Sequence, residues 1–336
     1  MIIKSVKLTN FRSHDFFELN CWKETAMISG ENGSGKTSIL EAIFEVLRGK
    51  SFRAVDKDIV QRGKDFYRVE LVYVSGEKIV VTYDFSTGKK MFLVGDKKTA
   101  RLPKKNRYPV VLFEPDDLNL VGASPSRKRE YFDRSFSQLS ETYSDSLSKY
   151  NKALRQRNEL LKRENVSRED LFSWNVLLAR FGVFLWKSRG ELVEKINDKL
   201  TGVYRSIAEN KDEIKILLKK DGEFDESMYL KELEKVFKKD KMIGHTSFGA
   251  HRDNYEFLFN GVEADGSASR GEVRSIVIAL KFIEADEIFQ KTRKIPVVLL
   301  DDVFSELDEM RQKALVKNFK KNQVIITSVG AVEDVG

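Results

Sequence analysis

Residues 30–37 read GENGSGKT, a glycine-rich segment that ends in a lysine and a threonine. It fits the pattern G-x-x-x-x-G-K-[S/T], with Gly30, Gly35, Lys36 and Thr37 at the defining positions. Glycines let successive backbone N–H groups point inward around a phosphate, and a following helix adds partial positive charge. Lys36 can reach the β- and γ-phosphates, and the Thr37 hydroxyl can ligate Mg²⁺. The segment therefore predicts a nucleotide site, but it does not separate the many classes of P-loop protein.

Two acids end an apolar stretch at residues 295–302, which read IPVVLLDD. A nearly continuous apolar run is typical of a parallel strand covered on both faces, and ligands bind at the carboxyl ends of such strands. We expect Asp301 to hold Mg²⁺ and Asp302 to orient or deprotonate an attacking water. Because Lys36 lies far upstream, a helical section must be inserted between the motifs before the chain returns to the same sheet.

A second candidate anion site lies at residues 267–275, SASRGEVRS. Ser269, Arg270 and Gly271 precede a predicted helix, and serine and glycine at a helix N-terminus can bind an anion. A chain with one nucleotide loop does not need a second one in the same pocket. We therefore expect this segment to close over a nucleotide bound by another copy of the chain.

The elements around the glycine loop are predicted from periodicity. Residues 24–29 read as a strand, and residues 38–49 as a helix with Gly49 as its C-cap. Glycines punctuate a series of β-branched and aromatic runs, which suggests an antiparallel meander. These runs are residues 67–74, 78–85, 90–95 and 108–113.

The pattern becomes helical after residue 115. Ser124 and Pro125 form a good helix start, and apolar residues then recur at steps of three and four, with one expected break. Ser167 and Asp170 resemble a capping box that opens a second helical run. The β/α pattern returns near residue 246, with strands expected at 295–302 and 322–328. The predicted fold class is therefore α/β, with an α/β part at residues 1–114 and 246–336 and a helical insertion at residues 115–245.

Composition restricts the class of protein further. No stretch approaches the roughly 18 apolar residues that span a bilayer, and a single cysteine, Cys21, excludes an intramolecular disulfide. We expect a cytoplasmic protein without a membrane partner. The net charge is +7, which permits an anionic partner. The basic residues that could face DNA lie in two bunches: Lys97, Lys98, Arg101, Lys104, Lys105 and Arg107, and Arg127, Lys128 and Arg129.

The order of these motifs resembles an ABC-type ATPase head of the SMC-related class, and within it the RecF family of bacterial replication and recombinational repair proteins. The resemblance covers nearly the whole chain and rests on long motifs. These are NFRSH (10–14), ENGSGKTSILEAIFEVLRGKSFR (31–53), EPDDLNLVGASPSRKREYFD (114–133), YNKALRQRNELLK (150–162), GAHRDNYEFLFNG (249–261) and DDVFSELD (301–308).

This resemblance implies a fold and a set of site residues. The fold would be a P-loop ATPase head with a mixed sheet and an antiparallel β subdomain (lobe I) and an inserted α-helical lobe II. Lys36, Asp302 and Ser269 would act in catalysis, with Arg270 and Gly271 beside Ser269 in trans, and Thr37 and Asp301 at Mg²⁺. ATP would contact Arg12, Ser13, Gly30, Asn32, Gly33, Ser34, Gly35, Lys36, Thr37 and Ser38.

The resemblance also implies a function. ATP would join two heads into a homodimer that clamps duplex or gapped DNA without sequence preference, and weak, DNA-stimulated hydrolysis would reset it. The partners would be the mediator proteins RecO and RecR and, indirectly, the recombinase RecA. An SMC-like or overcoming-lysogeny-type head, acting as a structural or defence subunit, is the alternative. The long heptad arms of condensin-like proteins are not seen, and the stretch after Asp308 is short for a fused nuclease.

Three positions depart from the family pattern. Glu272 stands where glutamine is usual, Ala250 where proline is usual and Asn254 where aspartate is usual. The position of the switch histidine of transporter ATPases falls near Thr327 and Ser328, and RecF proteins also tend to lack this histidine. We expect these departures to affect the rate of hydrolysis more than nucleotide binding. His251 and its neighbours in the GAHRD segment are expected to be structural or to lie at the lobe interface.

Overall fold

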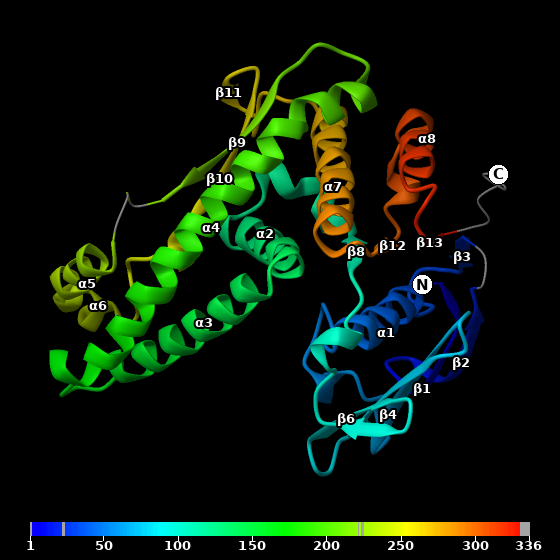
Figure 1. The fold of residues 1–336 in the computed structure, drawn as a ribbon, viewed down its shortest axis with the longest axis horizontal. Helices are drawn as coiled ribbons and strands as arrows, with labels where there is room; N and C mark the ends of the chain where they lie inside the picture. The colour runs from blue at the N-terminus through cyan, green and yellow to red at the C-terminus, as the bar shows by residue number, and fades with distance from the viewer. Residues whose placement is uncertain (1, 22–23, 221, 223–224, 330–336) are drawn as a thin grey trace. The chain divides into compact units, whose positions relative to one another are not determined.

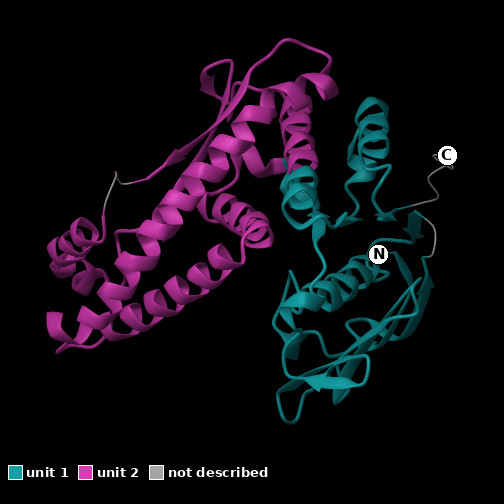
Figure 2. Ribbon diagram, viewed as in Figure 1, with its two compact units in different colours: residues 1–118, 284–336 teal, residues 119–283 magenta. Residues whose placement is uncertain are grey.

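The computed structural model describes residues 2–21, 24–220, 222 and 225–329. It divides into two compact units, residues 1–118 with 284–336 and residues 119–283 (Figure 2). Residues 246–283, placed with the α/β part in the expected division, therefore group with the helical unit here. The second boundary falls inside one long helix, α7 (Arg270–Thr292).

Unit 1 contains two sheets (Figure 1). One has six antiparallel strands in the order β2-β1-β4-β5-β6-β7. Their bounds are β1 (Ile3–Phe11), β2 (His14–Asn20), β4 (Phe66–Tyr73), β5 (Lys78–Asp84), β6 (Lys89–Val94) and β7 (Lys97–Thr99). The expected meander over residues 67–95 is confirmed as β4, β5 and β6.

The second sheet of unit 1 is parallel, with the order β3-β13-β12-β8. Its strands are β3 (Thr25–Ser29), β13 (Val324–Ser328), β12 (Val297–Leu300) and β8 (Val110–Phe113). The prediction that residues 108–113 continue the antiparallel meander is wrong, because β8 pairs in parallel with β12. All four β8 residues are buried, which is typical of a strand in a covered parallel sheet.

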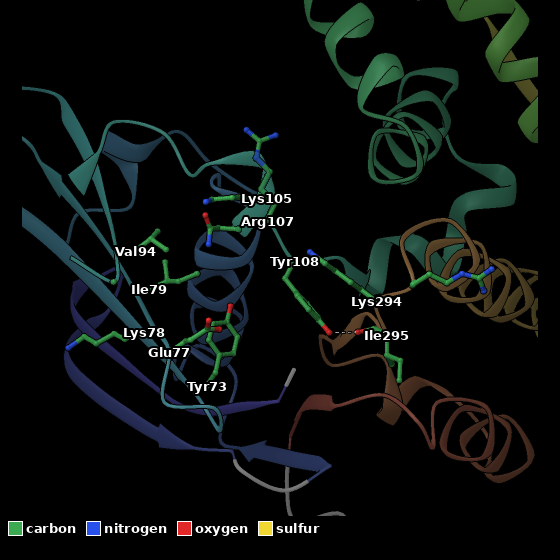
Figure 3. Close-up of a pocket in the computed structure, with 13 residues that line it drawn as sticks. Tyr73, Glu77, Lys78, Ile79, Val94, Lys105, Arg107, Tyr108, Lys294 and Ile295 are labelled. Atoms are coloured by element: carbon green, nitrogen blue, oxygen red, sulfur yellow. Dashed lines mark hydrogen bonds between the residues drawn. The ribbon is translucent and has the colours of Figure 1, made fainter. Parts of the chain in front are cut away.

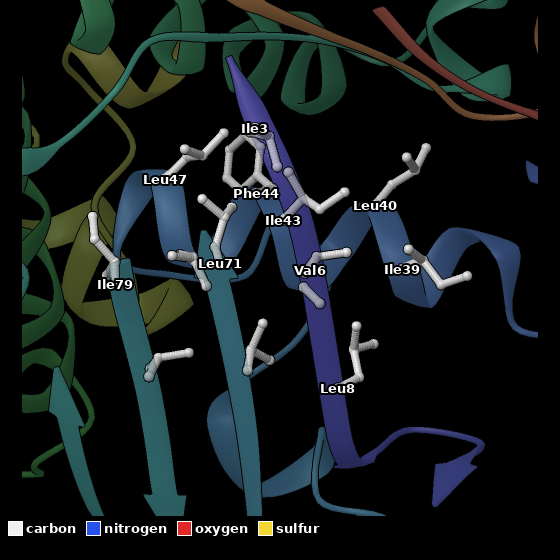
Figure 4. Close-up of a cluster of buried hydrophobic side chains, with 14 of the residues drawn as sticks. Ile3, Val6, Leu8, Ile39, Leu40, Ile43, Phe44, Leu47, Leu71 and Ile79 are labelled. Atoms are coloured by element: carbon white, nitrogen blue, oxygen red, sulfur yellow. The ribbon is translucent and has the colours of Figure 1, made fainter. Parts of the chain in front are cut away.

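Helix α1 (Lys36–Arg48) packs against the antiparallel sheet. Most of its side chains are buried, because it contacts β1, β4 and β5 of this sheet and also β8 and β13 of the parallel sheet. Figure 4 shows Ile39, Ile43 and Leu47 of α1 near Val6 and Leu71 of the strands. This packing fixes the N-terminal end of α1, where the glycine loop lies. Unit 1 also contains α8 (Glu309–Asn318) and the short 3₁₀ helices η1 (Asp56–Asp58), η2 (Lys104–Asn106) and η5 (Phe304–Glu306).

Unit 2 is mainly helical, with a three-stranded antiparallel sheet in the order β11-β10-β9. The helix expected to start at Pro125 breaks at Ser140, whose side chain accepts a hydrogen bond from the backbone of Tyr143 and so caps the next helix. The capping box at Ser167 and Asp170 is confirmed. The elements are η3 (Pro115–Gly122), which reaches into unit 2, α2 (Pro125–Leu139), α3 (Glu141–Leu161), α4 (Arg168–Ala208), β9 (Ile214–Lys219), α5 (Glu226–Lys235), α6 (Phe237–Ile243), η4 (Ala250–Arg252), β10 (Asn254–Phe259) and β11 (Val262–Glu263).

The expected α/β organisation, with a parallel sheet, an antiparallel part and a helical insertion, is confirmed. Among the described residues, the helices include none that is both long and apolar enough to cross a bilayer.

Candidate nucleotide-binding site

The glycine loop joins the end of β3 to the start of α1, as the motif requires. Gly33 and Gly35 have φ values of 83° and 91°, in the left-handed region that favours glycine. At Gly35 space is also lacking, because an added Cβ would lie 2.4 Å from Nε2 of His14 and 2.6 Å from Oγ of Ser13. The β1–β2 turn therefore packs directly against the loop, and Nε2 of His14 lies 3.1 Å from the carbonyl oxygen of Gly35.

Lys36 lies beneath the loop, with only 5 % of its surface exposed. Its Nζ donates hydrogen bonds to the carbonyl oxygens of Gly30 at 2.9 Å and Glu31 at 3.0 Å. The same Nζ is 3.8 Å from Oδ2 of Asp302. The glycine motif and the second acid, which are far apart in sequence, therefore meet in space.

Thr37 and Asp301 are in direct contact. The Thr37 hydroxyl donates to Oδ1 of Asp301 at 2.8 Å, and the Thr327 hydroxyl lies 2.9 Å from the same oxygen. Burial raises the pKa of Asp301, while the hydrogen bonds from the two threonines oppose that shift. Parallel pairing of β3, β13 and β12 brings the carboxyl ends of these strands to one edge, which is why the three side chains meet.

Asp302 has an unusual backbone and a buried side-chain atom. Its φ is 49°, which is uncommon for a residue other than glycine and is often found at functional sites. Its backbone N–H donates to Oγ1 of Thr327 at 2.9 Å. Oδ1 of Asp302 is buried and has no hydrogen-bond partner among the described residues. A buried acceptor of this kind is rare and fits a position where water or a ligand supplies the missing donor.

Arg12 is held mainly by Glu41, a fully buried residue of α1. Its Nε and Nη2 donate to the two Glu41 carboxylate oxygens at 2.9 Å and 2.8 Å, and Nη1 donates to the carbonyl oxygen of Asp58 at 2.8 Å. The hydrogen bond to Glu41 raises the pKa of Arg12. The bidentate pair fixes the β1–β2 turn over the glycine loop.

A cavity of about 660 Å³ brings most of the predicted nucleotide residues together. Four of its lining residues, Arg53, Asp58, Val60 and Arg62, were not predicted as site residues. Arg53 ends the motif at residues 31–53 but was given no role, and no motif or spacing marks the other three. Gly30, Ser34 and Asp301 do not line the cavity, although Asp301 contacts Thr37 beside it. The predicted residues in the lining are Arg12, Ser13, Asn32, Gly33, Gly35, Lys36, Thr37, Ser38 and Asp302.

The oxygen atoms of Thr37 and Asp301 fit a Mg²⁺ ion. Mg²⁺ binds few protein oxygens and keeps water and phosphate as its other ligands, so a hydroxyl and one carboxylate are sufficient. Residues 2–21, 24–220, 222 and 225–329 contain no cluster of three or more histidine, cysteine or acidic side chains suited to a metal.

Ser269, Arg270 and Gly271 lie in unit 2, at the N-terminal end of α7. Ser269 and Glu272 form a reciprocal pair. The Ser269 backbone N–H donates to Oε2 of Glu272 at 2.6 Å, and the Glu272 N–H donates to Oγ of Ser269 at 3.3 Å. The structure thus gives a local role to Glu272, because its side chain and that of Ser269 cap the N-terminal end of α7.

The two basic bunches differ in exposure. In unit 1, Lys97, Lys98, Arg101, Lys104 and Lys105 are exposed and Arg107 is half-buried. In unit 2, Lys128 is only 6 % exposed and lies over the ring of Phe257, while Nη1 of Arg129 donates to the carbonyl oxygen of Asp253 at 2.6 Å. Arg127 is half-buried. The bunch at 127–129 therefore makes internal contacts that the charge pattern did not reveal.

Comparison with known proteins gives consistent results. Residues 5–243 match a family model described as an AAA domain. The chain is 35 % identical to the DNA replication and repair protein RecF of Clostridium acetobutylicum, over 98 % of this chain and 93 % of that protein. It is 33 % identical to the protein of the same name from Clostridium perfringens, over 99 % of this chain and 94 % of that protein.

Solved structures also match nearly the full chain. One, described as the recombination mediator protein RecF-ATP in the RecFOR pathway, has a TM-score of 0.86 and 28 % identity, covering 99 % of this chain and 93 % of that one. A second, described as RecF-ATPrS, has a TM-score of 0.87 and 27 % identity, covering 99 % and 94 %. The fold is the mixed α/β ATPase head that these proteins share.

Proposed function

The chain belongs to the RecF family of DNA replication and repair proteins, and on that premise we propose that it is an ATP-driven DNA clamp of recombinational repair. The observation that carries this proposal is that Lys36, Thr37 and Asp302 line one cavity and that Asp301 contacts Thr37 beside it. An inert glycine turn would not require two distant acids to approach the lysine and threonine that follow it.

ATP would bind with its phosphates at the N-terminus of α1. Backbone N–H groups of the loop and the helix dipole favour negative charge there, and Lys36 can exchange its bonds to the Gly30 and Glu31 carbonyls for phosphate oxygens. Thr37 and Asp301 would hold Mg²⁺. When bound, that ion neutralises charge on the phosphate oxygens. The solved relatives described with ATP and ATPrS support this assignment.

Asp302 would act as the general base. Its buried Oδ1 has acceptor capacity that no described residue uses, so it can take a proton from an attacking water. Thr327 holds the Asp302 backbone and touches Asp301, so one side chain positions both acids. The absence of a histidine at this position is consistent with weak hydrolysis.

Ser269, Arg270 and Gly271 would complete the site of a second copy of the chain. They lie at the N-terminus of a helix of 23 residues, where a phosphate is favoured. ATP would then contribute contacts that exist only when two heads are together. A ligand shifts an association equilibrium only by such differential contacts, so ATP would drive dimerisation.

DNA contact would be to phosphates and therefore independent of sequence. The exposed members of the first bunch, Lys97, Lys98, Arg101, Lys104 and Lys105, suit this role best. The RecFOR context of the solved relatives suggests RecO and RecR as partner proteins in the cytoplasm, with loading of RecA as the outcome.

The test is ATP-dependent binding of a labelled DNA duplex over a range of salt. We expect affinity to rise with ATP and to fall steeply with salt. A Lys97→Ala/Lys98→Ala/Arg101→Ala protein should show a salt slope shallower by about one unit per charge that contacts phosphate. Lys320→Ala, which removes an exposed lysine elsewhere in unit 1, serves as the control. A flat salt dependence, or equal binding without ATP, would refute the proposal.

A further inference from the structure

Unit 1 contains a second cavity, of about 730 Å³, that shares no lining residue with the nucleotide cavity (Figure 3). It lies where β8 and β12 begin, whereas Asp301 and Asp302 follow the end of β12. Helix α1 links the two places, because Gly35 precedes it and the Tyr108 N–H donates to the carbonyl oxygen of Leu47 in its last turn at 2.9 Å. A helix of 13 residues is about 20 Å long, so the cavities are separate.

The charged residues that line this second cavity are mostly basic. They include Lys78, Lys105, Arg107, Arg293 and Lys294, with Glu77 as the acidic member. Nearby, burial and the charge of Arg107 lower the pKa of Arg48 to about 10, an effect that Glu284 opposes. Lys78 pairs with Glu70 at 2.7 Å, so the other four basic residues of the lining supply the positive charge that an anion would neutralise.

Two buried polar atoms of the lining lack partners within the described part of the chain: the Tyr73 hydroxyl and Nε of Arg107. Tyr73 is only 2 % exposed. Burial raises its pKa, so its hydroxyl keeps its proton and can donate. Figure 3 shows Lys105 and Arg107 on one side of the cavity and Tyr73 with Glu77 on another. Buried donors without partners are rare, and here both would be satisfied by negatively charged oxygens.

The remaining walls are apolar or aromatic. Ile79 and Val94 come from the antiparallel sheet, and Ile295 and Tyr108 from the chain leading into the parallel sheet. The Tyr108 hydroxyl donates to the carbonyl oxygen of Ile295 at 2.9 Å, which fixes its ring beside the cavity. Apolar walls with a few convergent polar groups are typical of small-molecule sites, and the volume resembles that of the nucleotide cavity.

We propose that the second cavity binds a phosphate-bearing ligand of mononucleotide size, with Arg107 and Tyr73 donating to its phosphate oxygens and Lys105 and Lys294 supplying further positive charge. A free nucleotide and the terminal nucleotide of a DNA strand share this chemistry. The proposal does not depend on the function assigned to Lys36.

Calorimetric titration tests it, with ADP, AMP and inorganic phosphate as the probes. The wild-type chain should bind two ADP molecules, and Lys36→Ala should retain one. In the Lys36→Ala background, Arg107→Ala and Tyr73→Phe should each weaken that remaining site about tenfold or more. Arg101→Ala removes an exposed arginine of the same bunch that does not line the cavity, and it should leave the affinity unchanged.

Two further measurements complete the test. Tyr73→Phe should not lower the thermal midpoint without ligand, because the hydroxyl has no partner to lose among the residues described. Competition between AMP and a short oligonucleotide with a 5′-phosphate shows whether a free nucleotide or a DNA end binds this cavity more tightly. Binding of either one supports the site. The proposal fails if Lys36→Ala binds none of these probes, or if Arg107→Ala and Tyr73→Phe leave binding unchanged.

Discussion

At the scale of single residues, the candidate nucleotide site depends on a few side chains that the chain brings together from distant segments. Lys36 and Thr37 start α1, Asp301 and Asp302 follow the end of β12, and Thr327 on β13 contacts both acids. The motif residues were predictable, because each belongs to a spacing with a known chemical purpose. Thr327 was recognised only as a position without histidine, and its link to both acids required the structure.

Asp302→Asn tests the proposed general base. Asparagine tolerates the positive φ of this position and is nearly the same size, so the fold and ATP binding should persist. Without a carboxylate to accept the proton, hydrolysis should fall about a hundredfold or more. Single-turnover hydrolysis, measured beside equilibrium ATP binding, checks this. An unchanged hydrolysis rate with normal binding would exclude Asp302 from the chemistry.

Glu272→Gln tests the departure from the family pattern. The Glu272 carboxylate accepts from the Ser269 N–H and places negative charge where the partner's phosphate would bind. Glutamine can keep the capping hydrogen bond without the charge. We therefore expect the ATP concentration needed for self-association to fall several-fold.

The control for this change is Glu191→Gln, which makes the same substitution at an exposed position of α4. It should leave the ATP dependence of self-association unchanged. Equal ATP dependence in the wild type and Glu272→Gln would mean that Ser269 does not meet a phosphate.

At the scale of elements, what could be predicted was local. Helix periodicity and caps depend on neighbouring residues, so the capping box at Ser167 followed from the sequence, whereas the expected break in the first helical run was placed at Ser140 only by the structure. The pairing of β8 with β12 joins distant segments, and the apolar sequence of a strand does not indicate which strand it pairs with. The ion pairs of Arg189 with Asp133 and Asp253 could not be predicted either, because helical periodicity does not indicate that an arginine on a long helix is buried.

His251 gives an element-scale prediction for unit 2. Its Nε2 lies 3.0 Å from the carbonyl oxygen of Thr246 and must donate, so Nδ1 accepts from the Tyr150 hydroxyl at 2.8 Å. Burial lowers the pKa of His251 to about 4; the charges of Arg252 and Arg129 act in the same direction, and Asp240 opposes them. The neutral ring is therefore part of the fold.

The sign of the pH effect follows from this shift. The unfolded chain binds a proton at His251 below about pH 6.5, whereas the folded chain does not until about pH 4. The stabilisation is present above pH 6.5 and is lost as the pH falls. From pH 7 to pH 5 the loss should be roughly 2 kcal/mol. Denaturant unfolding at several pH values measures it.

Two comparisons isolate the histidine. Burial raises the pKa of Asp253 to about 6, so the titration of Asp253 changes the stability in the opposite direction between about pH 4 and pH 6. Asp253 is present in the wild type and in both variants compared here. His251→Gln should show a flatter dependence of unfolding free energy on pH than the wild type. His245→Gln changes an exposed histidine and should keep the wild-type slope. Identical slopes in all three proteins would contradict the assignment.

At the scale of the whole molecule, the chain leaves the α/β part, builds a helical unit and returns to complete the parallel sheet. That path was predictable from the distance between Lys36 and Asp301 and from the change in periodicity. The boundaries were less accessible, because α7 runs from one unit into the other without a composition change. A single copy carries both the glycine loop and the Ser269 segment. In the proposed clamp, the glycine loop of each copy meets the Ser269 segment of the other copy.

In the proposed clamp, ATP joins two copies of the chain. The direct test is the molar mass in solution, by light scattering, with ATP, with ADP and without nucleotide, for the wild type and for Lys36→Ala. The chain has a mass of 38.7 kDa, and we predict that this value doubles only for the wild type with ATP. The same mass in all three states, or a doubled mass of Lys36→Ala with ATP, would contradict ATP-driven dimerisation.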